Sequence, residues 1–457
     1  MPSSGVSHET SPIRRAGLKL ALVFIFLRIT GLHELIAAKL GSNFFILYWF
    51  AIPALLCLLF SGGVSRLLRE ATVRLWMAFA GWVLLAVLTS DWPGGSLQVA
   101  ATFIRTELPV LFLIAGLALT WSDCSRLLNV LALAAFTNIF LAFCFPGEAG
   151  ATGRFEVAAD VAMNNANDFA ALMLLLLPFL ILVLLMPGRF FGLRALALVC
   201  LSYGIYLILH TGSRGAMIGL AITVLFTLAK LPLMQRVWTV AFVAVLCFVM
   251  LVAVPASILS RAASAFSVGG VLSSSDSSST LFTSDDQSSA ADESAESRWY
   301  LFKTSLLFTA QHPIWGVGPG QFANHEGLSA GAQGVHGSWH ETHNSYTQAS
   351  SEDGVPAFIL LIAALVLTYR SLSRNYRKIR SLPPTPETKK ISLAFFCVLI
   401  SFVAFCCASF FLSLVYEFYF PLLTGLAIAL NHALENDSQA LTEDGVQVEA
   451  GFSPTLA

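Results

Sequence analysis

Residues 298–357 read RWYLFKTSLLFTAQHPIWGVGPGQFANHEGLSAGAQGVHGSWHETHNSYTQASSEDGVPA. This long polar segment holds five histidines and a glycine-rich turn, whereas most of the chain around it is apolar. Apolar runs long enough to cross a bilayer flank it on both sides. We therefore expect a polar site at a membrane surface, held in place by membrane-spanning helices.

The composition predicts an all-α polytopic membrane protein. Of the 457 residues, 56% are hydrophobic and 12% are charged, and the mean hydropathy is +0.74. Apolar stretches of roughly 18 or more residues recur, and each has the length of a helix that crosses the hydrocarbon core. We predict about twelve transmembrane helices, with one large extracytoplasmic loop between the ninth and the tenth. The expected spans are residues 18–36, 43–60, 73–90, 103–121, 126–145, 168–186, 192–209, 214–231, 236–255, 353–370, 391–412 and 416–433.

Lys and Arg residues set the expected orientation. They concentrate at the N-terminus and in every second connection, above all between residues 370 and 390. Because cytoplasmic loops are enriched in these residues, we place both termini in the cytoplasm. The first apolar run lacks a small-residue cleavage site, so we interpret it as a retained helix. The expected organisation is a cytoplasmic N-terminus (1–17), helices 1–9 (18–255), a periplasmic loop (256–352), helices 10–12 (353–433) and a cytoplasmic tail (434–457).

The outer loop divides into two parts. Residues 267–297 are mostly Ser, Asp, Thr, Ala and Glu, a composition typical of a disordered linker. Residues 298–352 are expected to be ordered and to carry the site. Apolar residues at helical spacing predict an amphipathic helix that begins at Arg298 and lies on the membrane. It should stop before Pro313, since proline disfavours helix in the preceding residue.

Two further features are expected in the ordered part. Gly318 and Gly320 should form a tight turn whose backbone amides are free to approach a ligand. The segment near His343 should begin a helix that continues into the tenth span.

Positive charge on the outer side runs against the usual bias, so it suggests an anion to be bound there. Arg214, at the outer end of a helix, and Arg298, at the start of the ordered part, are the candidates. A snorkelling interfacial anchor is the competing interpretation of Arg214. Two other outer arginines are expected in structural ion pairs, Arg28 with Glu34 and Arg105 with Glu107.

Five short motifs, in this order, resemble the O-antigen ligase/polymerase family: 164–169 (NNANDF), 211–215 (TGSRG), 298–299 (RW), 312–322 (HPIWGVGPGQF) and 343–346 (HNSY). The resemblance implies a multi-pass glycosyltransferase of the bacterial inner membrane with its site on the periplasmic side. Its donor would be an undecaprenyl-pyrophosphate-linked glycan, and its acceptor a hydroxyl of a glycolipid or glycan, such as lipid A core. It implies neither a cofactor nor a metal.

The chemistry of such a transfer assigns roles to residues. Arginine matches phosphate oxygens bidentately and stays charged, so Arg214 and Arg298 are expected to hold the pyrophosphate. His343 is expected to act as the general base on the acceptor hydroxyl, because an unperturbed imidazole titrates near pH ~6.5. A histidine that merely caps a helix or packs a loop is the alternative. Supporting roles are expected for Asn344, Gly318, Gly320 and Asn167.

The acceptor is left open by the sequence. Gly354 follows the His-Asn pair at the spacing of the ligase pattern, but Ala357 stands where that pattern has Gly, Thr or Tyr. An O-antigen or exopolysaccharide polymerase and a protein O-oligosaccharyltransferase therefore remain alternatives to a ligase.

Other classes of function fit less well. His336, His340 and His343 could be read as metal ligands, but the His340–His343 spacing is one residue short of a zinc-protease helix, and we expect no metal there. A transporter or flippase of a lipid-linked anion would favour related halves and midplane charges, and no internal repeat is visible. No basic stripe interleaved with aromatic residues indicates nucleic-acid binding.

Overall fold

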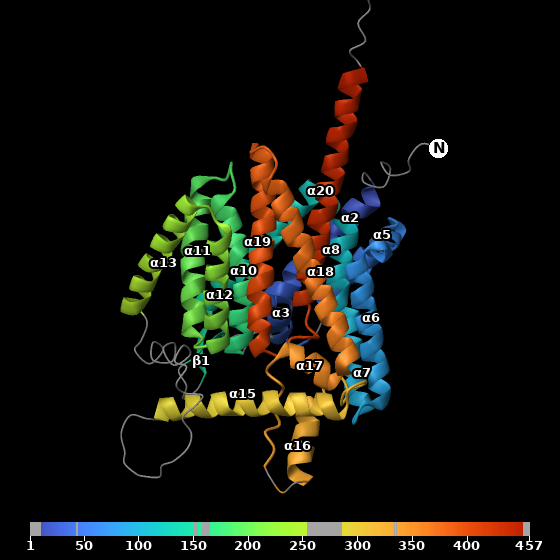
Figure 1. Cartoon of the computed structure of the whole chain (residues 1–457), viewed down its shortest axis with the longest axis vertical. Helices are drawn as coiled ribbons and strands as arrows, with labels where there is room; N and C mark the ends of the chain where they lie inside the picture. The colour runs from blue at the N-terminus through green and yellow to red at the C-terminus, as the bar shows by residue number, and fades with distance from the viewer. Residues whose placement is uncertain are drawn as a thin grey trace, which may run out of the picture.

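The computed structural model describes residues 11–42, 44–149, 154–157, 165–253, 286–332, 334 and 336–450. Within these residues the protein is a bundle of helices with one antiparallel pair of short strands, β1 (Pro146–Ala149) and β2 (Arg154–Val157). Most of the helices run side by side along the long axis of the molecule (Figure 1). The all-α polytopic architecture expected from the sequence fits this bundle.

Seven segments are long and apolar enough to cross a membrane: α6 with η1 (Ala71–Thr89), α7 through η2 to α8 (Pro93–Leu117), α9 (Trp121–Cys144), α10 (Ala166–Leu185), α11 (Phe191–His210), α18 (Gly354–Arg380) and α19 with η5 (Pro386–Phe411). Two bent pairs raise this number to nine: α2 (Pro12–Thr30) with α3 (Leu32–Leu40), and α4 (Ile46–Phe60) with α5 (Gly63–Arg69). The bends measure 71° and 80°. Each follows a left-handed glycine, Gly31 or Gly62, that ends the regular helix.

The three remaining expected spans coincide with α12 (Arg214–Lys230), α13 (Leu233–Ala253) and α20 (Tyr419–Ala450). Over the residues that the structure describes, these three do not reach the length and apolarity of the others. Helices thus lie at every expected position, but the expected count of about twelve spans is not confirmed. The structure supports seven to nine.

The basic connections gather at one end of the bundle. There the Arg380 guanidinium donates to the carbonyl of Lys230 at 3.1 Å, and the start of α2 and the far end of α20 lie at the same end (Figure 1). Helices α15 (Asp286–Gln311) and α16 (Phe322–Ala332) lie at the opposite end, where α15 runs across the bundle (Figure 1). The separation matches the orientation expected from charge, while the assignment of this end to the periplasm stays a prediction.

Helix α15 corrects one boundary in the loop. It ends at Gln311, just before His312-Pro313, as the proline predicts. It begins at Asp286, however, so residues 286–297 are helical and the expectation of disorder for them is wrong. Ala, Glu and Gln in this stretch favour helix once a helix C-terminal to them is anchored. The rest of the expected linker, residues 267–285, lies outside the described residues.

A second correction concerns the approach to the tenth span. Helix α17 (Ser345–Glu352) does not continue into α18, because Asp353 and Gly354 break the two apart. Gly354 has φ +84°, and a Cβ there would collide with the backbone of Ile314. The break lets the 312–318 segment lie against the junction of the two helices.

Candidate functional site

His343 is held by its backbone in an unusual conformation. Its φ is +49°, in the left-handed region that non-glycine residues seldom adopt, and its N–H donates to Ser413 Oγ at 2.9 Å. Asn344 caps α17, because its Oδ1 accepts from the amides of Tyr346 and Thr347 at 2.9 and 3.1 Å. The helix cap is therefore Asn344, not His343, and the supporting role of Asn344 in the site stays a prediction.

The start of α17 is joined to the segment that follows α19. Ser345 Oγ donates to the Leu412 carbonyl at 2.6 Å and accepts from the amide of Leu414 at 2.9 Å. Tyr346 donates its hydroxyl proton to the carbonyl of Cys406 at 2.7 Å. These buried hydrogen bonds fix the backbone on either side of His343 and so limit where its imidazole can lie.

The short helix η5 (Ser409–Phe411) is the common neighbour of all three site elements. The ring of Phe410 lies 6.3 Å from Phe302, one turn beyond Arg298 on α15, and 6.3 Å from Tyr346 on α17. Phe411 packs on Gly215 at the start of α12, so closely that a Cβ on Gly215 would lie 2.5 Å from the Phe411 Cβ. Near neighbours of Arg214, Arg298 and His343 thus contact one short helix, although the three residues are far apart in sequence.

Arg214 occupies the first position of α12. Ser213 caps that helix, with its hydroxyl accepting from the amide of Ala216 at 3.4 Å. The Arg214 Nη2 atom is buried and has no hydrogen-bond partner among the described residues. A snorkelling anchor would place its guanidinium in water. A buried donor beside a helix N-terminus instead has the character of a site for an anion.

The charge state of His343 depends on its neighbours. Burial, the nearby Arg298 guanidinium and His340 together lower the pKa of His343 from its ordinary value to about 4. The imidazole is therefore neutral at physiological pH and able to accept a proton. Because the Arg298 charge affects the His343 pKa, the two side chains lie near each other.

The glycine-rich turn differs from expectation. The amide of Gly318 donates to the Glu352 carbonyl at 2.8 Å, and that of Gly320 to Glu352 Oε2 at 2.9 Å. These amides are therefore not free to approach a ligand, and that part of the prediction is wrong. Glu352 is the last residue of α17 and is buried against the turn. Burial raises its pKa to about 7. The glycines instead position the turn against the α17–α18 junction.

Asn167 lies in the first turn of α10 and is largely buried. The backbone N–H of Asn167 donates to Asn165 Oδ1 at 2.9 Å, so Asn165 caps the helix. The neighbouring Asp168 interacts electrostatically with Glu341. The start of α10 therefore lies near the loop that carries His343.

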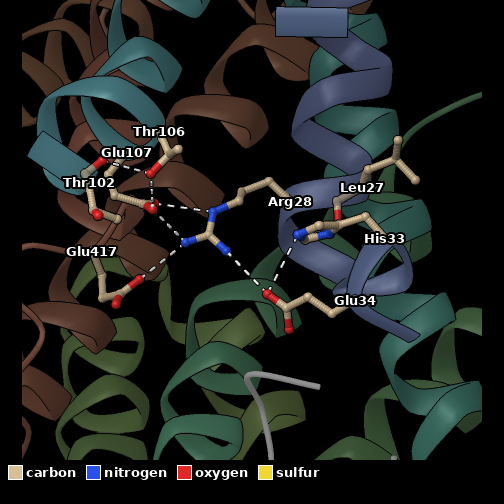
Figure 2. A network of polar contacts seen from close by, with 8 residues as sticks. All are labelled: Leu27, Arg28, His33, Glu34, Thr102, Thr106, Glu107 and Glu417. Carbon is tan, nitrogen blue, oxygen red and sulfur yellow. Dashed lines mark hydrogen bonds and ion pairs between the residues drawn. The ribbon is translucent and has the colours of Figure 1, made fainter. Parts of the chain in front are cut away.

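Arg28 lies among three carboxylates, which it contacts directly (Figure 2). Its guanidinium makes two hydrogen bonds to Glu107, at 2.7 and 3.2 Å, and lies 3.5 Å from Glu417 and 3.8 Å from Glu34. The expected pair with Glu34 is present. The expected pair of Arg105 with Glu107 is wrong, because residues two apart on a helix point in different directions.

The histidines do not assemble a metal centre in the described part of the chain. The His340 and His343 rings lie 6.3 Å apart. His325 contacts Asp91 and stacks edge-on with His312, away from the other two. Across the residues that the structure describes, no three His, Cys, Asp or Glu side chains are grouped as a metal site would require.

Sequence reasoning missed two features. One is η5, where Ser409 is the single polar residue, so that the sequence gives no reason to place it at a site. The other is a cleft of about 510 Å³ bounded by α7 (Pro93–Thr102), the glycine-rich turn, α17 and the 413–417 segment. Four carboxylates line this cleft: Glu107, Glu341, Glu352 and Glu417.

Residues 196–362 match the family model described as O-antigen ligase. No curated protein matches the chain. The matched region contains Arg214, Arg298, the glycine-rich turn and His343. It confirms the family resemblance that the motifs indicate, and with the apolar helices it supports a multi-pass membrane protein of the O-antigen ligase/polymerase type.

Proposed function

We propose that this protein transfers a glycan from an undecaprenyl-pyrophosphate carrier to an acceptor hydroxyl at the periplasmic face of the inner membrane. The match of residues 196–362 to the O-antigen ligase model supports the reaction class. The observation that carries the assignment of residues is the clustering of Arg214, Arg298 and a neutral His343 around η5.

In the proposed reaction the acceptor oxygen bonds to the anomeric carbon of the glycan. The bond between that carbon and the pyrophosphate oxygen breaks, and the bonding pair leaves with the pyrophosphate. Arg214 and Arg298 stabilise the negative charge on the leaving group, while His343 takes the proton of the acceptor hydroxyl. This division needs one cationic face and one neutral base, the roles that we propose for Arg214 and Arg298 and for His343.

Lipid A core is the acceptor that we propose first, since the matching family is described as a ligase. A polymerase would use a second carrier-linked repeat, and an oligosaccharyltransferase would use a protein. Glycan analysis of cells that lack the protein separates the three outcomes: missing core attachment, single repeats on the core, or unmodified protein.

The first test removes each group from the purified full-length protein. We expect His343→Ala to abolish transfer while binding of undecaprenyl pyrophosphate survives. We expect Arg214→Ala and Arg298→Ala to weaken donor binding and transfer together, with a rate loss of about 10²–10³ each. Lysine at either position should retain more donor binding and transfer than alanine but less than arginine, because an ammonium group cannot bind two phosphate oxygens as the guanidinium does.

Arg236→Ala is the matched control, since this exposed arginine lies at the start of α13 and bonds to carbonyls of the α12–α13 connection. It should leave both measurements unchanged. Normal transfer by His343→Ala would rule out the base assignment. Loss of wild-type activity on chelation would show that a metal takes part.

A further inference from the structure

The cleft of about 510 Å³ lies directly beside His343 but outside the arginine cluster. Ser413, which accepts the His343 N–H, lines the cleft, as does Glu341, two residues before His343. Neither Arg214 nor Arg298 is among its lining residues. His343 is not among the lining residues either, so the cleft lies against the backbone beside His343 and apart from the proposed pyrophosphate site.

The charge of the cleft is unsuited to a phosphate. Among the residues that the structure describes, four carboxylates line it, and no lysine, arginine or histidine does. Arg28 balances part of this charge, because it binds Glu107 and lies near Glu417, two of the lining residues (Figure 2). Burial raises the pKa of Glu341, and that of Glu352 to about 7, so these side chains carry less than full negative charge. A phosphate or carboxylate group in the cleft would still lack a cationic partner in a partly desolvated space, which is costly.

The remaining lining suits a hydroxyl-rich ligand. Trp92 is 59% exposed at one edge, and its ring packs over Gly95, so closely that a Cβ there would lie 2.5 Å from the ring. The primary amides of Gln98, Gln321 and Asn324 offer both donors and acceptors on the walls. An exposed aromatic face together with amides and carboxylates can bind the apolar face and the hydroxyls of a sugar at once.

The inner wall has an irregular backbone at this point. Residues Phe103–Glu107 form a π-helical turn between α7 and α8, and both end residues line the cleft. Such turns occur often at functional sites. Here the turn directs Glu107 inward, where its carboxylate is held by Arg28.

We propose that this cleft binds the acceptor glycan, and that its carboxylates select a sugar without phosphate or carboxylate groups next to the reacting hydroxyl. This assignment rests on the proposed transfer reaction. The donor pyrophosphate is held on the arginine side of His343 and the acceptor sugar on the carboxylate side. Opposite charge on the two sides keeps each substrate out of the other's position.

Binding without donor provides the direct test. The full-length protein in nanodiscs is titrated calorimetrically with a neutral trisaccharide and with the same trisaccharide carrying one phosphate. We expect the neutral sugar to bind more tightly. Trp92→Ala should weaken its binding by about tenfold or more, the loss expected when an aromatic platform is removed, and Trp92→Phe should recover most of it. Trp238→Ala, an exposed tryptophan on α13, is the matched control and should change nothing.

Charge selection is tested separately with Glu341→Gln. The substitution should narrow the preference for the neutral over the phosphorylated sugar by several-fold, whereas Glu387→Gln at the start of α19 should leave it unchanged. Tighter binding of the phosphorylated sugar by the wild type would overturn the proposal. So would neutral-sugar binding that Trp92→Ala does not affect.

Transfer assays on the same variants distinguish this proposal from the reaction itself. If His343→Ala abolishes transfer but Trp92→Ala leaves the acceptor KM unchanged, the cleft assignment fails and the reaction stands. If Trp92→Ala weakens sugar binding while His343→Ala transfers normally, the proposed division of labour fails and the cleft remains a sugar site. In either case Trp92→Ala should not change the donor KM.

Discussion

The neighbours of His343 decide how its imidazole titrates. Arg298 is a permanent cation, and it disfavours a second positive charge nearby, as does burial. The sequence suggested a base at His343 and a cation at Arg298, but not that each affects the other. Their coupling depends on α15 packing directly on α17, for instance through the Thr309–Ser350 hydrogen bond, which is a tertiary arrangement that local pattern does not encode.

The pKa of His343 leads to a prediction about pH. The neutral imidazole is the active base, so activity should be present above its pKa and lost as pH falls through it. The pKa of about 4 belongs to the protein without donor, and the pyrophosphate proposed beside Arg298 should raise it. His340→Gln removes one cause of the lowered pKa, so the acidic limb of kcat/KM for the acceptor should move upward, toward 6.5. Arg298→Gln should move it further in the same direction.

The measurement is the pH profile of kcat/KM at saturating donor, which allows for the weaker donor binding of Arg298→Gln. A matched substitution, His432→Gln, changes a histidine that pairs with Glu70 at the other end of the bundle and should leave the limb in place. If the acidic limb stays at the same pH in His340→Gln and Arg298→Gln, protonation of His343 does not determine the pH dependence of the rate.

At the level of elements, close backbone packing determines the shape of the site. Gly316 has φ +67°, and a Cβ there would collide with the carbonyl group of Glu352. The sequence predicted a turn from these glycines but assigned their amides to a ligand. It could not show that the 312–318 segment would lie against the α17–α18 junction, because that contact joins residues distant in the chain.

This packing predicts a large loss of stability for Gly316→Ala. The left-handed backbone should cost about 1–2 kcal/mol, and the crowding about 1–3 kcal/mol more. Gly188→Ala is the control, since Gly188 also has positive φ (+81°) but has open space around its Cβ position. In detergent, Gly316→Ala should melt well below Gly188→Ala. Equal melting temperatures would mean that the turn shifts freely and does not hold the site.

Helix α15 gives a second prediction at this scale. Deleting residues 273–285 should leave transfer largely intact, because their Ser-, Thr- and Asp-rich composition is typical of a linker with little apolar surface to bury. Extending the deletion through 297 removes the first 12 residues of α15, about 18 Å of helix, and brings the cut to Arg298. The longer deletion should lower donor binding. Complete loss of transfer in a normally expressed 273–285 deletion would contradict the linker interpretation.

The basic connections of the whole molecule gather at one end of its helix bundle. Hydropathy located each helix, since each long apolar run must be helical in lipid. The expected count of about twelve spans is not confirmed, because α12, α13 and α20 fall short of the required length and apolarity over the described residues. The α2–α3 and α4–α5 pairs count as spans only if each bent pair is taken as one. The carboxylate cleft was not predictable, because its acids come from four separate segments, each unremarkable alone.

The orientation of the bundle is the prediction on which the site depends. Basic connections lie at one end and α15–α17 at the other, so the positive-inside bias places the site in the periplasm. In a background with the native cysteines replaced by alanine, Ser278→Cys should react with a membrane-impermeant maleimide added to spheroplasts. Ser381→Cys, exposed between α18 and α19, should react only after permeabilisation. The reverse pattern would put Arg214, Arg298 and His343 in the cytoplasm, where a donor displayed on the outer face could not reach them.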